Sequence, residues 1–486
     1  MISRTLCVSA LLTLAATMAL PALGQTFATL HIFCANTACT DGEIPEGTLV
    51  QGTDGEYYGT TSSGGSGGSG TVFRITPGGA LTTLYGFCAA DGCTDGASPV
   101  AGLIQATDGD FYGTTYIGGA GGHGTVFKIT SNGALTSLYS FCAQLLSGWC
   151  AHGEYPNGSL IQGTDGKFYG TTYEGGANGY GSIFSISPGG ALKTLYSFCA
   201  AAHCTDGASP APGLIQASDG NFYGTTADGG TGNGTIFRLT PDCRLKTLYT
   251  FCSGNCVNGA TPSSGLIQAA DGDLYGSTSF GGVNNAGTLF KITMDGKLTT
   301  LYSFCTQANC PDGHYPQALT QGTDGNFYGV TSAGGAQLYY GTIFRMTPAG
   351  ALTTLHSFCA EDACADGANP SGGLMQATNG DFYGTTHGNA EAGGAGKAGS
   401  VFRLSVGLGS FVRAQTTSGK VGAAVTILGT DLEGAASVTF NGTAAEFKVV
   451  SGTEITSTVP PSATTGTVEV STPRGLLASA VPFRVL

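Results

Sequence analysis

The stretch that decides the fold is GLIQATDGDFYGTTYIGGAGGHGTVFKITSNGALTSLYSFC, residues 102–142. It recurs with small changes along most of the chain, and three landmarks set its period. The first is a Tyr-Gly pair, the second is a β-branched residue or Leu followed by Phe, and the third is Leu-x-x-Phe-Cys. Each landmark recurs in register at seven positions along the chain. A fixed repeat of this length indicates a solenoid or a propeller.

Each unit contains four short apolar runs separated by turn residues. In the second unit these runs cover residues 103–105, 111–115, 125–130 and 135–141. They are rich in aromatic and β-branched residues and are bounded by Gly, Asn, Asp and Ser, which is typical of strands joined by hairpins. Four strands in each of seven units predict an all-β chain folded as a seven-bladed β-propeller.

The order of the landmarks predicts how such a ring would close. The repeats open with the fourth-strand motif alone, at residues 27–33, and end with the first three strands alone, at residues 373–404. One blade would then be completed by strands from both ends of the chain, which leaves no exposed seam. A solenoid gains nothing from splitting a repeat in this way, so we favour the ring.

The first 24 residues differ from the rest. Arg4 precedes an apolar stretch at residues 6–20, and small residues at 22–24 offer a cleavage site before Gln25. We interpret residues 1–24 as a signal peptide rather than a membrane anchor, because the apolar run is short. The predicted domains are then the repeats at 25–406 and a second domain at 411–486. The mature protein is expected to be secreted, periplasmic or on the cell surface.

The charged residues of the chain exclude one class of binding partner. The chain has 18 Lys and Arg against 31 Asp and Glu, a net charge of −13, and no basic run. This argues against nucleic acid as a partner. We expect no membrane span in the mature chain, and we expect an extracellular glycan or a surface protein as the ligand.

Cysteine is distributed with the repeat. Fourteen cysteines form local pairs, one per unit, which in an exported protein predicts disulfides. The predicted pairs are Cys34 with Cys39, Cys88 with Cys93, Cys142 with Cys150, Cys199 with Cys204, Cys252 with Cys256, Cys305 with Cys310, and Cys359 with Cys364. Zinc is the alternative, but a zinc site needs four ligands and these pairs should lie far apart. Cys243 is left over where other units have Gly, and we interpret it as a drifted turn position rather than a reactive thiol.

Several polar residues also recur. Asp or Asn precedes Gly in the first hairpin of every unit, which suits the turn; calcium, the alternative, needs more clustered oxygens. A Gln in the predicted innermost strand is assigned to hydrogen bonds between blades rather than to a ring of ligand contacts: Gln51, Gln105, Gln162, Gln216, Gln268, Gln321 and Gln376. Six units place Arg or Lys after the third-strand Phe, and Ser185 replaces it in the third unit. A pair between this cation and the turn Asp is a hypothesis.

Function is expected where the units differ. The Gly-rich loops after each second strand and the cysteine loops should share one face of the ring. Aromatic residues on rigid loops often contact sugars or proteins, although they can also simply pack the loops. The residues predicted to bind a ligand are Trp149, His152, Tyr180, His203, Tyr339, Tyr340 and His387.

Two parts of the chain resemble known families. Motifs such as TDGxFYGTT and GTVFKIT, in tandem over residues 26–405, resemble the GloVer tandem repeat of secreted bacterial proteins, a resemblance that implies no catalytic residues. Residues 419–429, 438–442, 455–460 and 466–470 resemble an IPT/TIG domain. That resemblance implies an immunoglobulin-like β-sandwich used as a spacer or interaction module, and the short alternating strands agree with it.

The sequence lacks the common motifs of catalysis. The sequence has no P-loop, Rossmann fingerprint, HExxH or convincing nucleophile elbow, and its His residues are scattered, so we expect no cofactor and no metal. Glu154, Glu174, Asp228 and Glu361 are non-repeated acids, but no spacing singles out the carboxylate pair that a glycosidase needs. We therefore predict a non-catalytic exported binding or structural protein. The alternative is an extracellular polysaccharide-active hydrolase or lyase, and self-association at the cell surface is compatible with the first prediction.

Overall fold

The computed structural model describes residues 24–486 except 36–37, 90, 144–149, 253 and 389–396. The described chain is all-β, as predicted. Its helical residues are three 3-10 turns, Asp91–Cys93, Ala202–Cys204 and Asp362–Cys364. Within the described ranges, no helix has the length and apolar character that crossing a membrane requires.

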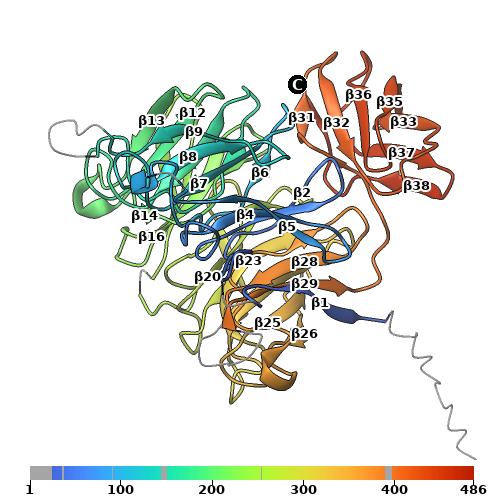
Figure 1. The fold of residues 1–486 in the computed structure, drawn as a ribbon. Coiled ribbons are helices and arrows are strands. Elements are labelled where there is room, and N and C mark those ends of the chain that lie inside the picture. Colours follow the sequence, from blue (N-terminus) through green and yellow to red (C-terminus); the bar gives the residue numbers. More distant parts are fainter. Residues whose placement is uncertain (1–23, 36–37, 90, 144–149, 253, 389–396) are drawn as a thin grey trace, which may run out of the picture.

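The repeats form seven antiparallel sheets, which we number as units 1 to 7 (Figure 1). Units 1 to 3 contain β2 (Val50–Gln51), β3 (Tyr57–Thr61), β4 (Thr71–Ile75) and β5 (Leu81–Gly86); β6 (Ile104–Gln105), β7 (Phe111–Thr115), β8 (Thr125–Ile129) and β9 (Leu135–Ser140); and β10 (Ile161–Gln162), β11 (Phe168–Thr172), β12 (Ser182–Ile186) and β13 (Leu192–Ser197). The strands of unit 2 match the predicted runs to within one residue at each end.

Units 4 to 7 repeat this plan with small additions. They contain β14 (Ala208–Pro210), β15 (Ile215–Gln216), β16 (Phe222–Asp228), β17 (Thr235–Leu239) and β18 (Leu245–Thr250); β19 (Ile267–Gln268), β20 (Leu274–Thr278), β21 (Thr288–Ile292) and β22 (Leu298–Ser303); β23 (His314–Gln321), β24 (Phe327–Ala333), β25 (Thr342–Met346) and β26 (Leu352–Ser357); and β27 (Met375–Gln376), β28 (Phe382–Thr386), β29 (Ser400–Ser405) and β1 (Thr26–Ile32).

Unit 7 joins the two ends of the repeat region. Strand β1, near the start of the described chain, pairs antiparallel with β29, with Thr26 opposite Ser405 and Ile32 opposite Ser400. This is the pairing that the order of the landmarks predicts. It gives β29 a neighbour on both sides, so that this strand is not left as an open edge.

The Tyr-Gly landmark follows from packing within and between sheets. Gly113 lies opposite Phe127 on the neighbouring strand, and a Cβ on Gly113 would come within 2.7 Å of the Phe127 ring. Tyr112 is fully buried and stacks on Phe168 of the next unit, with ring centroids 4.0 Å apart. Glycine therefore makes room inside the sheet for the Phe, and the adjacent Tyr joins one sheet to the next.

The repeated Gln residues link all seven units. The backbone N–H of Thr107 in unit 2 donates to Oε1 of Gln162 in unit 3 (3.0 Å), and equivalent bonds of 2.8–3.1 Å join every other neighbouring pair. The last of them runs from Thr378 in unit 7 to Gln51 in unit 1. These hydrogen bonds form a closed cycle, so the predicted role of the Gln residues between units is confirmed.

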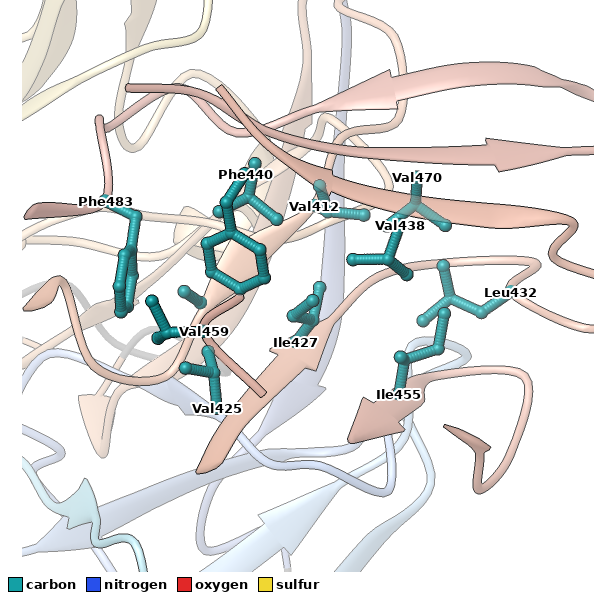
Figure 2. Packing of buried hydrophobic residues seen from close by; sticks show 12 residues of the cluster. Val412, Val425, Ile427, Leu432, Val438, Phe440, Ile455, Val459, Val470 and Phe483 are labelled. Atoms are coloured by element: carbon teal, nitrogen blue, oxygen red, sulfur yellow. The ribbon is translucent and has the colours of Figure 1, made fainter. Parts of the chain in front are cut away.

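The C-terminal domain has its own core. Its two four-stranded sheets are β30 (Arg413–Ala414), β32 (Ala424–Leu428), β36 (Glu454–Thr458) and β35 (Phe447–Val449), and β34 (Thr443–Ala445), β33 (Ser437–Phe440), β37 (Val468–Thr472) and β38 (Gly475–Ala478). Strands β31 (Ser418–Gly419) and β39 (Arg484–Val485) form a parallel pair. Buried Val, Ile, Leu and Phe side chains such as Ile427, Phe440 and Phe483 fill the core (Figure 2).

This domain packs against the turns of units 1, 2 and 7. Thr453 Oγ1 donates to the carbonyl of Thr53 (2.7 Å), and Gln415 Nε2 donates to the carbonyl of Ala106 (2.9 Å). In unit 7, the Phe411 N–H donates to the carbonyl of Thr378 (2.9 Å). We call the face that carries these Asp-Gly turns the turn face, and the face that carries the cysteine loops the stapled face.

Candidate functional site

Seven disulfides lie on the stapled face, and they are the seven pairs predicted from the sequence. Each joins two cysteines that are four, five or eight positions apart. The bonded pairs are Cys34 and Cys39, Cys88 and Cys93, Cys142 and Cys150, Cys199 and Cys204, Cys252 and Cys256, Cys305 and Cys310, and Cys359 and Cys364.

The cysteine loops also bind the Gly-rich loops. In unit 2, the N–H of Gly119 in the Gly-rich loop donates to the carbonyl of Cys93 (2.8 Å). Equivalent bonds of 2.8–2.9 Å end on the carbonyls of Cys39, Cys150, Cys204, Cys256 and Cys310. The second cysteine of each of these pairs therefore holds two loops, one through its sulfur and one through its backbone.

In five of the seven units, a buried or partly buried Asp two residues after the second cysteine fixes the cysteine loop to a sheet. Asp95, which is 7% exposed, accepts hydrogen bonds from the Tyr85 hydroxyl (2.8 Å) and from the Ala89 N–H (3.1 Å). Asp41, Asp206, Asp312 and Asp366 make equivalent contacts, with His31 and His356 replacing Tyr in two of them. We call this contact the Asp latch. The recurring Cys-x-Asp pattern was its sequence signal, and sequence reasoning missed it.

One position on the stapled face has the same backbone conformation in all seven units. The residue before a Pro has a left-handed φ of 51–59° in each unit: Ile44, Ser98, Tyr155, Ser209, Thr261, Tyr315 and Asn369. Non-glycine residues rarely adopt this conformation, and β-branched ones such as Ile44 least of all. The N–H of each residue donates to a loop carbonyl of the preceding unit, as in Tyr155 to His123 (3.0 Å). The backbone is thus the same seven times while the side chain changes.

Aromatic and acidic side chains gather at one of these positions. The Tyr155 ring lies 5.1 Å from Tyr116 and 5.2 Å from His123, centroid to centroid. Nδ1 of His123 lies 2.7 Å from Oε2 of Glu154. Glu154 in turn pairs through its backbone with Glu174, which is exposed. We call Tyr116, His123, Glu154, Tyr155 and Glu174 the Tyr155 cluster.

The two carboxylates act on the tyrosines of this cluster. Burial, together with the charges of Glu154 and Glu174, raises the pKa of Tyr155 above its usual value. Burial and the charge of Glu174 do the same to the pKa of Tyr116. Both phenols therefore stay protonated as donors near two acceptors. Aromatic faces beside carboxylate acceptors suit a sugar, which has apolar C–H faces and hydroxyl donors.

Several of the predicted ligand-binding residues lie at the surface but outside this cluster. Tyr180 is 49% exposed and Tyr339 is 68% exposed, and His203 is exposed in a 3-10 turn. Tyr340 instead packs against a buried core cluster. Trp149 lies outside the described residues.

The two remaining predicted residues have partners. His152 takes the position of the latch Asp in unit 3, where its Nδ1 lies 2.9 Å from Thr194 Oγ1. His387 Nε2 lies 3.4 Å from Glu46 Oε1. Among the described residues, no hydrogen bond, ion pair or ring contact joins any two of the predicted set. The Tyr155 cluster was missed because its members come from two units and three separate loops.

One cysteine pair lies beside this cluster. The ligand atoms of His123, Cys142, Cys150 and Glu154 all lie within 4.8 Å of one another. A cysteine pair alone offers two potential ligands, and the sequence does not predict that His123 and Glu154 lie next to this one. Metals bind thiolates, and these two sulfurs are bonded to each other, so the oxidised group offers an imidazole and a carboxylate.

The turn face is more uniform. The Tyr112 hydroxyl donates to Asp108 Oδ2 (2.7 Å), and five other units repeat this contact while Asn379 replaces the Asp in unit 7. Lys128 Nζ lies 3.4 Å from Asp108 Oδ2 and 2.5 Å from Asp110 Oδ2. Burial and the hydrogen bond to Asp108 raise the pKa of Tyr112 to about 12. The predicted cation–Asp pair is thus present in unit 2, and Lys291 repeats it in unit 5.

The comparisons with known proteins agree with the repeat and with the second domain. The sequence profile described as Gloeobacter/Verrucomicrobia repeat matches residues 16–149, 145–311 and 305–434. The chain belongs to this repeat family. The IPT/TIG domain profile matches residues 409–484. No curated protein sequence matches the chain.

Several solved structures are similar to this chain in fold, although their sequence identity to it is low. The extracellular domains of two putative hybrid two-component systems from B. thetaiotaomicron match with a TM-score of 0.50 and 11% identity, over 95% of this chain. The chain spans only 57% and 59% of those domains. A fungal alcohol oxidase of the AA5 family, in complex with copper, matches with a TM-score of 0.52 and 12% identity, over 95% of this chain and 98% of its own. Identities this low indicate a shared fold alone.

Proposed function

We propose that this protein is an exported, non-catalytic binding protein whose stapled face recognises an extracellular glycan. Its seven sheets are the blades of a β-propeller, and its C-terminal domain is an immunoglobulin-like sandwich that serves as a spacer or docking module. The observation that carries the proposal is the Tyr155 cluster. There, a backbone conformation common to seven units presents aromatic rings and carboxylates in one place.

Other observations support this proposal. Left-handed backbone at non-glycine residues costs roughly 1–3 kcal/mol each and is often found at ligand sites. The disulfides and the Asp latches hold the surrounding loops, so binding a ligand would cost little conformational entropy in ordering these loops. The resemblance in fold to extracellular domains of two-component systems fits an extracellular binding role.

The test is a glycan-array screen with the chain from Gln25 onward and two variants. Tyr155→Gly keeps the left-handed backbone and removes the ring, and we expect it to lose the bound glycans. Tyr315→Gly makes the same change at the equivalent, left-handed residue of unit 6, and we expect it to bind as the parent does. A blank array, or equal losses in both variants, would contradict a glycan site at Tyr155 and favour a surface protein as the partner.

A polysaccharide-active enzyme is the second candidate. Glu154 and Glu174 are paired through their backbones, so two carboxylate residues lie side by side. Glycoside hydrolysis uses such a pair of acids. Any glycan that binds should therefore be incubated with the protein and its products analysed. Release of products that Glu154→Gln and Glu174→Gln both abolish would replace the non-catalytic proposal.

A further inference from the structure

A large cavity lies on the other side of the molecule, between the turn face and the C-terminal domain. It measures about 1220 Å³ and is lined by turns of units 2 to 5 and by residues of the C-terminal domain. Ligand sites often lie at the junction of two domains and typically occupy roughly 300–1,000 Å³. The C-terminal domain contacts units 1, 2 and 7, so this cleft extends over units 3 and 4.

Two residues that depart from the repeat, Ser185 and Cys243, line this cleft, and neither takes part in the proposed function. Ser185 stands where six units have Arg or Lys, and Cys243 stands where other units have a turn Gly. Cys243 keeps the glycine-like backbone, with a φ of 66°, and its sulfur is not in a disulfide. Departures from an otherwise regular repeat therefore coincide with a cavity.

Ser185 opens a space that a cation fills elsewhere. In units 2 and 5 the Lys Nζ lies 5.8 and 5.7 Å from the centroid of the landmark Tyr ring. Unit 3 has no such cation on β12, and its Tyr169 is 9% exposed, whereas Tyr112 is fully buried. Tyr169 lines the cleft together with Ser185.

Basic side chains surround this space. Lys167 Nζ lies 2.9 Å from Asp165 Oδ2 and neutralises that acid. Lys193 lies opposite Ser185 on the neighbouring strand, and Arg484 reaches the cleft from the C-terminal domain. Neither Lys193 nor Arg484 has a carboxylate partner within ion-pair distance in the part of the chain that the structure describes. On a protein with net charge −13, this is a local positive surplus that would attract an anion.

We propose that the cleft is a second ligand site and that it binds an acidic oligosaccharide. Lys193 and Arg484 would bind its carboxylates. The Ser185 hydroxyl and the polar side chains of the C-terminal domain, such as Thr417, would bond its hydroxyl groups. The cleft lies on the opposite face from the Tyr155 cluster, so this proposal stands or falls independently of the proposed function.

Cys243 gives a direct readout of this site. In the chain from Gln25 onward, a thiol-reactive reagent should label Cys243, the free cysteine on the cleft wall. We expect trigalacturonate to slow this labelling severalfold and in a saturable manner, and uncharged maltotriose to leave it unchanged. Lys193→Glu and Arg484→Glu should each abolish the protection.

The matched control is Lys246→Glu. Lys246 occupies the same strand position in unit 4, opposite Arg238, so this variant changes the net charge equally while unit 4 keeps its repeat cation. We expect it to retain the protection, and thermal melts check that all three variants are folded. The proposal is overturned if trigalacturonate leaves the labelling rate unchanged, if maltotriose protects equally, or if Lys246→Glu loses protection as fully as Lys193→Glu.

Discussion

The two faces of the repeat region use sequence repetition in opposite ways. On the turn face the same side chains meet in nearly every unit, as the Tyr112–Asp108 bond shows. On the stapled face the backbone repeats, with its left-handed residue before Pro, while the side chain at that position ranges from Ile44 to Tyr155. On the turn face, side chains that are the same in nearly every unit hold the sheets together. On the stapled face, a backbone conformation that is the same in every unit allows the side chains to differ from unit to unit.

The strongest way to break this comparison is to truncate equivalent aromatic residues on the two faces. Tyr112 is fully buried, and removal of a buried aromatic ring costs about 3–5 kcal/mol, so Tyr112→Ala should lower the free energy of unfolding by that amount. Tyr155→Gly should change it by less than about 1 kcal/mol, because its ring is only partly buried and glycine relieves the left-handed strain. Urea unfolding of both variants tests this, and equal losses would contradict the division between the faces.

The Asp latch is the part of the stapled face that should behave like the turn face. Asp366 is fully buried, and losing the charge from its hydrogen bonds should cost about 1.5–3 kcal/mol at pH 7 in Asp366→Asn. Asp362→Asn removes an exposed acid from the same loop and should be nearly neutral.

The latch should also depend on pH. Burial pushes the pKa of Asp366 up, but hydrogen bonds from His356 and from the backbone of Ala360 outweigh burial and hold this pKa below its usual value of 3.8. The stabilisation by Asp366 is therefore present above pH 3.8 and is lost as the pH falls through the lower, folded-state pKa. The gap in melting temperature between the parent and Asp366→Asn should therefore narrow as the pH falls below 3.8. A gap that stays constant across this range would argue against a charged latch.

The disulfides sharpen the comparison because, among the described residues, all of them lie on the stapled face. The Cys88–Cys93 bond closes a short loop, and the loop-entropy account gives it about 2 kcal/mol. Replacing both cysteines by Ser should lower the free energy of unfolding by that amount. Limited proteolysis should then cut the freed loop of unit 2 first, and cleavage elsewhere would show that the disulfide does not hold this loop locally.

The smallest effect concerns His387, one of the predicted binding residues. Its hydrogen bond with Glu46, opposed by burial, raises the pKa of His387 above its usual value. Protonated His387 therefore stabilises the fold. This stabilisation is fully present when the pH is below the unfolded-state pKa of about 6.5, and it is lost as the pH rises through the higher, folded-state pKa. His387→Gln should therefore lower the melting temperature slightly at about pH 5.5 and leave it unchanged at about pH 9. The opposite trend would show that His387 folds as the neutral form.

Sequence reasoning worked where a residue acts within its own unit or in the same way in all seven. The strand positions, the local cysteine pairs and the Gln bonds between units all follow from features that recur, because each recurrence is an independent sign of the same contact. The pairing of β1 with β29 also follows, since the incomplete units at the two ends complement each other.

Sequence reasoning failed where a contact joins residues of different units, or where a side chain has two possible partners within reach. Arg74 pairs with Glu56 rather than with the turn Asp54, because an acid two residues further along lies equally within its reach. His152 was predicted to bind a ligand because it is an aromatic residue on a loop that differs between units. It follows Cys150 by two residues, however, which is the position of the latch Asp in other units. The Tyr155 cluster and the cleft depend on how separate loops and domains meet, and spacing along one chain does not contain that information.

The pairing of β1 with β29 has a consequence for how the protein is made. Thr26 is synthesised before its partner Ser405, and the strands of units 1 to 6 are made between the two. While the strands of units 1 to 6 are being made, β1 has no partner strand on which to dock. The last sheet is thus assembled by the first and the last strands of the repeat region, and a chain that is cut short before Ser405 cannot complete the pairing of β1 with β29.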